Sequence, residues 1–141
     1  STLDDMRGLH AVTDVTGFGL LGLALEMCRP AGLTAEIFAR APALLEGVEA
    51  LAQAGVRTGA AVRNWSSYGD AVRLPSDLAD WRKDLLCDPQ TSGGLLIAVE
   101  PSHADELLQT LREANFGASR IIGRFGAGEP GVRVIDAAMG D

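Results

Sequence analysis

The stretch Thr13-Asp14-Val15-Thr16-Gly17-Phe18-Gly19-Leu20-Leu21-Gly22 decides the architecture of this chain, because it connects an expected strand to an expected helix. Residues 9–15 predict the strand that enters the turn. Residues 20–28 are apolar on nearly every side, which predicts a helix buried over most of its surface. A helix N-terminus carries unpaired N–H groups and the positive end of the helix dipole, and glycines let the backbone approach an anion closely. The stretch therefore predicts a turn that suits a phosphate group.

The carboxylate of Asp14 narrows the chemistry of this turn but leaves three interpretations open. A carboxylate repels a bare phosphate, whereas with Mg²⁺ between them it becomes a metal ligand. Gly17, Gly19 and Gly22 also fit the dinucleotide pattern G-x-G-x-x-G, with Glu36 on the next expected strand. Against that second interpretation, Asp14 and the two threonines crowd the pyrophosphate position, and Glu36 falls in mid-strand. In the third, the glycines only allow close packing and Asp14 caps the helix.

A second small and polar segment, Asp88-Pro89-Gln90-Thr91-Ser92-Gly93-Gly94, precedes an apolar strand over residues 95–99. Pro89 restricts the backbone, the hydroxyls of Thr91 and Ser92 can bond locally, and the glycine pair permits positive φ or a close approach. The segment is typical of a plain tight turn. Its hydroxyls and glycines could equally line the same cleft as the first turn.

The rest of the chain alternates short strands and helices, which predicts an α/β or α+β fold with helices packed on a mixed β-sheet, and of the two we expect the α+β class. Residues 57–76 show no clean period and are expected to form a long loop. The other expected elements are strands at 33–38, 121–125 and 132–135 and helices at 44–52, 77–86 and 102–115.

Composition limits the classes of function. The 141 residues fit one domain, and the net charge of −7 disfavours a nucleic-acid partner because the basic residues are scattered. We expect no membrane span, no secretion signal and no structural zinc. Cys28 and Cys87 stand apart in the sequence, so we expect two small buried hydrophobes in a reducing, cytoplasmic protein.

Taken together, these segments resemble the C-terminal half of selenophosphate synthetase (selenide, water dikinase). The resemblance rests on the two turn segments in this order, on Arg63-Asn64-Trp65 through Tyr68-Gly69-Asp70, and on Ile122-Gly123-Arg124. It implies the C-terminal domain of the aminoimidazole ribonucleotide synthetase-like fold over residues 10–141, after a remnant of a preceding helix or linker at 1–9. Other ATP-binding members of that superfamily, or a binding module without chemistry, remain the alternatives.

The resemblance also implies a reaction, in which selenide, ATP and water give selenophosphate, AMP and phosphate with Mg²⁺. In that family the ATP site lies between two domains, and the reactive Cys or selenocysteine, a Lys and several metal-binding Asp residues belong to the N-terminal one. The resemblance therefore implies no catalytic residue in this chain, and Cys87 does not match the reactive cysteine. It implies a homodimeric full-length protein and an inactive isolated chain, whose partner is its own N-terminal domain. Asp14 matches a metal ligand, and the expected cleft-lining residues are Thr13, Thr16, Gly17, Thr91 and Ser92.

Overall fold

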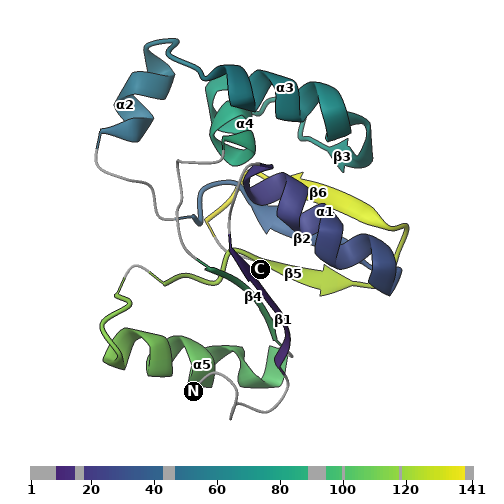
Figure 1. The fold of residues 1–141 in the computed structure, drawn as a ribbon, viewed down its shortest axis with the longest axis vertical. Coiled ribbons are helices and arrows are strands. Elements are labelled where there is room, and N and C mark those ends of the chain that lie inside the picture. Colours follow the sequence, from purple (N-terminus) through teal and green to yellow (C-terminus); the bar gives the residue numbers. More distant parts are fainter. Residues whose placement is uncertain are drawn as a thin grey trace.

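The computed structural model describes residues 9–14, 18–42, 47–88, 95–99, 101–117 and 119–138, with the backbone alone for 9–14 and for most of 95–99. Two sheets organise these residues (Figure 1). Strands β1 (Leu9–Asp14) and β4 (Leu95–Val99) form an antiparallel pair. The other sheet has four strands in the order β3-β6-β2-β5: β3 (Val72–Arg73), β6 (Gly131–Ile135), β2 (Thr34–Phe38) and β5 (Gly123–Gly126).

The four-stranded sheet is mixed, as the α+β prediction requires. Strand β2 runs parallel to β6 and antiparallel to β5, and β3 runs parallel to β6. The strands expected near residues 33–38, 121–125 and 132–135 are all present with small shifts of their ends. Parallel neighbours need a crossover, and between β2 and β6 the chain passes through several helices and through β3, β4 and β5.

Helix α1 (Gly19–Ala31) packs on one face of this sheet and supplies more residues to the core cluster than any other element (Figure 1). Leu21, Leu25 and Cys28 are fully buried and belong to one cluster with residues of β2 and β6. Burying a leucine side chain completely contributes about 1.5–3 kcal/mol to folding. The helix ends at Gly32, whose φ of +67° turns the chain and allows its N–H to bond the carbonyl of Arg29.

The prediction of a long loop at 57–76 is wrong. The chain there forms α3 (Gly59–Tyr68), a short 3₁₀ helix (Gly69–Ala71) and β3. Thr58 caps α3, since its hydroxyl accepts a hydrogen bond from the N–H of Ala61 at 3.0 Å. The inward face of α3 carries Ala61, Asn64, Trp65 and Tyr68, which have helical spacing but mixed chemistry. A search for apolar periodicity alone therefore misses this helix.

Three further helices complete the described residues. Helix α2 (Val48–Gln53) is shorter than the expected 44–52, and residues 43–46 lie outside the described ranges. Helix α4 (Asp80–Cys87) packs beside α3 at one end of the molecule, and α5 (Pro101–Glu113) lies at the other end below β1 and β4 (Figure 1). Among the residues that the structure describes, no helix is both long and apolar enough to cross a membrane.

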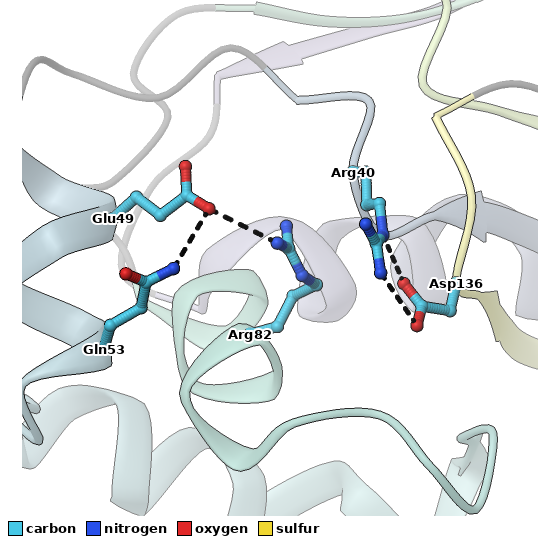
Figure 2. Close-up of polar contacts among 5 residues, drawn as sticks. All are labelled: Arg40, Glu49, Gln53, Arg82 and Asp136. Atoms are coloured by element: carbon cyan, nitrogen blue, oxygen red, sulfur yellow. Dashed lines mark hydrogen bonds and ion pairs between the residues drawn. The ribbon is translucent and has the colours of Figure 1, made fainter.

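Two sets of surface contacts join elements far apart in sequence (Figure 2). Arg40, just after β2, forms an ion pair with Asp136, just after β6, with Nε 2.7 Å from Oδ1. Asp136 in turn raises the pKa of Arg40 above its ordinary value. On α2, Glu49 lies 3.5 Å from Arg82 of α4 and accepts a hydrogen bond from Gln53. The first pair links the carboxyl ends of the parallel strands β2 and β6, and the second joins α2 to α4.

Candidate functional site

Pairing of β1 with β4 brings the two turn segments to the same end of the two-stranded sheet. The backbone of Asp14 pairs with Leu95, and that of Thr13 pairs with Leu96. Because the strands are antiparallel, the chain leaves β1 where it enters β4. The segment that follows Asp14 and the segment that precedes Leu95 therefore start from neighbouring points.

The far ends of the two segments also meet, where the start of α1 contacts the end of α4. Gly19 has a φ of +73°, and a Cβ there would lie 2.6 Å from the carbonyl carbon of Cys87 and closer still to its oxygen. Only glycine satisfies both the conformation and the contact. Each segment is thus anchored beside the other at both of its ends.

Helix α3 adds three polar contacts to this junction. Thr58 donates a hydrogen bond to Oδ2 of Asp88 at 2.7 Å, and Nδ2 of Asn64 donates to the carbonyl of Cys87 at 2.9 Å. The hydroxyl of Tyr68 donates to the carbonyl of Phe18 at 2.7 Å. One helix therefore contacts residues at the start of α1 and at the end of α4.

Burial controls the protonation of the groups around the junction. It raises the pKa of Tyr68 well above its ordinary value, an effect to which Cys87 adds, so the phenol remains a hydrogen-bond donor at neutral pH. Burial also raises the pKa of the Cys87 thiol to about 11. Cys28 and Cys87 are free and buried, as expected for small hydrophobes.

The predicted site residues fall mostly outside what the structure describes. Asp14 and Thr13 end β1, with their backbone described and their side chains not, while Thr16, Gly17, Thr91 and Ser92 lie outside the described residues. Metal ligation by Asp14 and the lining of a cleft stay predictions. Within the described ranges, no three His, Cys, Asp or Glu residues gather closely enough to hold a metal ion.

Glu36 faces away from α1. Its neighbours Ala35 and Ile37 pack into the core beneath α1, so the side chain of Glu36 is on the opposite face of the sheet. There it accepts a hydrogen bond from Arg124 at 2.7 Å and lies 3.7 Å from Arg133. A carboxylate engaged by two arginines on this face does not suit a ribose contact beside the glycine turn, which further disfavours the dinucleotide interpretation.

Sequence reasoning assigned no role to Thr58, Asn64 and Tyr68, although two of them lie in the segment that carried the resemblance. A threonine at the start of a helical pattern is a recognisable capping signal. The spacing from Ala61 to Asn64 and Tyr68 is also helical once polar residues are admitted to the buried face. These two signals together would have found the helix.

Comparison with known proteins agrees with this architecture. The family described as "AIR synthase related protein, C-terminal domain" matches residues 2–136. The chain belongs to this family.

Relatives within the family bear out the resemblance to selenophosphate synthetase. The chain is similar to proteins named "Selenide, water dikinase": 49% identical over 132 residues to that of Pseudomonas straminea and 46% over 134 residues to that of Paraburkholderia xenovorans. The protein of that name from Rhizobium meliloti is 47% identical over 127 residues. These matches cover 94%, 94% and 90% of this chain but only 37%, 38% and 36% of the relatives. The chain thus spans a little over a third of their length.

Proposed function

We propose that this chain is the C-terminal domain of an enzyme that converts selenide, ATP and water into selenophosphate, AMP and phosphate. The observation that carries the proposal is the meeting of the two turn segments at both of their ends, through β1–β4 pairing and the contact of Gly19 with Cys87. These are the segments that resemble selenophosphate synthetase. The names of the similar proteins favour this chemistry over that of other members of the superfamily.

The donors near the first turn fit a magnesium–phosphate group. Asp14 offers a carboxylate where β1 ends, and α1 begins a few residues later. Phe18 supplies no side-chain cap to α1, and no acidic side chain lies in the first turn of the helix, so none of the side chains described at this helix start offsets the positive end of its dipole. Mg²⁺ held by Asp14 would neutralise charge on the phosphates as they transfer.

In this proposal the other residues of the two segments shape the site. Thr13, Thr16 and Gly17 line it from the first segment, and Thr91 and Ser92 line it from the second. One carboxylate cannot hold a catalytic Mg²⁺ alone, because the ion requires a nearly octahedral set of oxygens. The remaining protein ligands and the reactive Cys or selenocysteine come from the protein's own N-terminal domain. The working enzyme is a cytoplasmic homodimer, and this chain by itself is inactive.

Substitution of Asp14→Asn in the full-length enzyme tests the metal role. The change removes one negative charge from a small side chain, so we expect the Mg²⁺ concentration for half-maximal ATP turnover to rise by about tenfold or more. Asp105→Asn makes the same change on the exposed surface of α5 and is expected to have no effect. Equal Mg²⁺ dependence of the two variants, measured at limiting Mg²⁺, would contradict the proposal.

A further inference from the structure

We propose that α3 is the positioning element of this site, and that Asn64 and Tyr68 set how the two turn segments lie relative to each other. The inference rests on the proposed function, because it assigns the two residues a role in placing Asp14 and the phosphate-facing backbone. We assign each as a positioning residue, because its side chain donates to a backbone carbonyl: Asn64 to that of Cys87, just before the second segment, and Tyr68 to that of Phe18, within the first.

Asn64 controls the end of α4. Cys87 is the last residue of that helix, where the carbonyl groups have no partner within the helix and the dipole is negative. The amide of Asn64, which is only 9% exposed, donates to this carbonyl at 2.9 Å. The bond fixes the direction of the peptide from which residues 88–94 depart.

Tyr68 controls the start of α1. Its hydroxyl donates to the carbonyl of Phe18 at 2.7 Å, and its ring covers the first turn of the helix, where a Cβ on Gly22 would lie 2.9 Å from Cε2. The phenol therefore locates the residue just before α1 and the turn whose N–H groups would face a phosphate. The phenol is protonated at neutral pH, as a tyrosine ordinarily is, so it can donate this bond.

The two contacts act together because Asn64 and Tyr68 are four residues apart on one face of a rigid helix. The start of α3 is fastened as well, since Thr58 both caps the helix and donates to Asp88. A shift of α3 would move the end of α4 and the start of α1 in concert. We infer that the separation of the end of α4 from the start of α1 is thereby set by two side chains on the same helix.

The decisive variant is Tyr68→Phe in the full-length enzyme, because it deletes one oxygen and keeps the ring over Gly22. Misplacement of reacting groups by a fraction of an ångström lowers turnover steeply, so we expect kcat/KM for ATP to fall by about tenfold or more. Asn64→Asp, which replaces the donor with an acceptor, is expected to have the larger effect. Ser67→Ala removes a hydroxyl from the exposed side of α3 and is the matched control.

Hydrogen–deuterium exchange supplies a readout that does not depend on activity. In the folded Tyr68→Phe variant we expect faster amide exchange in the first turn of α1, and in the folded Asn64→Asp variant we expect it at the end of α4. Exchange in α5 is expected to be unchanged in both variants. If Tyr68→Phe exchanges like Ser67→Ala, the inference is wrong. Uniformly faster exchange throughout the chain would also overturn it, because the residue would then serve stability alone.

A double variant separates this inference from the proposed function. If Tyr68 acts by placing Asp14, the double variant Asp14→Asn/Tyr68→Phe will lose about as much kcat/KM as Asp14→Asn alone. If the two residues act independently, the fold-losses of the single variants will multiply. An inactive wild-type enzyme would contradict the proposed function itself. An active wild type with a damaging Asp14→Asn and a silent Tyr68→Phe would overturn only the positioning role.

Discussion

At the scale of single residues, burial decides whether a cysteine thiol is reactive. Cys87 directly precedes one of the two turn segments, yet its thiol is fully buried beside Tyr68 and Asp84. A nucleophilic cysteine needs a lowered pKa and solvent access, and this thiol has neither. The physical environment agrees with the resemblance, which assigns the reactive group to another domain.

We therefore predict that Cys87 resists alkylation in the folded protein. Its pKa of about 11 lies above the ordinary value near 8.5, so the thiol keeps its proton throughout that interval in the folded state and loses it in the unfolded state. The free energy of unfolding then falls as the pH rises from about 8.5 toward 11. Peptide mass spectrometry after iodoacetamide treatment at pH 8 measures how much of Cys87 is alkylated in the folded protein. Rapid labelling of Cys87 without denaturant would contradict the prediction.

At the scale of elements, apolar periodicity predicted the strands β2, β4 and β6 and the helices α1, α4 and α5 with small errors at their ends. It failed for α3, because the inward positions of that helix hold an amide, two aromatic rings and an alanine. The amide is there for a specific reason, since Asn64 satisfies the carbonyl of Cys87. The helix that sequence reasoning missed is thus the one that contacts both turn segments.

Because α1 and α4 approach each other closely, replacing two different glycines with alanine is expected to lower the free energy of unfolding by different amounts. Gly19 and Gly32 both have positive φ, but only at Gly19 would a Cβ collide with a backbone. Gly32→Ala is expected to lower the free energy of unfolding by about 1–2 kcal/mol through strain alone. Gly19→Ala adds an overpacking cost of about 1–3 kcal/mol, because α4 must move. Calorimetric unfolding of the full-length variants measures the difference, and equal losses would contradict the packing argument.

At the scale of the whole molecule, strand pairing places the start of the first turn segment beside the end of the second. The residues alone predicted that the first turn suits a phosphate group, and they left open whether the second segment is a plain tight turn or lies beside the first. That juxtaposition comes from the pairing of β1 with β4, two strands separated by most of the chain, and such long-range pairing leaves no local signal. Nor could one carboxylate at Asp14 define a metal site, because Mg²⁺ takes about six oxygen ligands and the proposal draws the others from outside this chain.

The most direct test of this account is the identity of the products made by the full-length enzyme. Phosphorus NMR of the enzyme with ATP, Mg²⁺ and selenide under anaerobic conditions follows every phosphate at once. The account predicts selenophosphate, AMP and inorganic phosphate in equal amounts, with no selenophosphate when selenide or Mg²⁺ is omitted. ADP as the nucleotide product, with no phosphorus signal that depends on selenide, would contradict it.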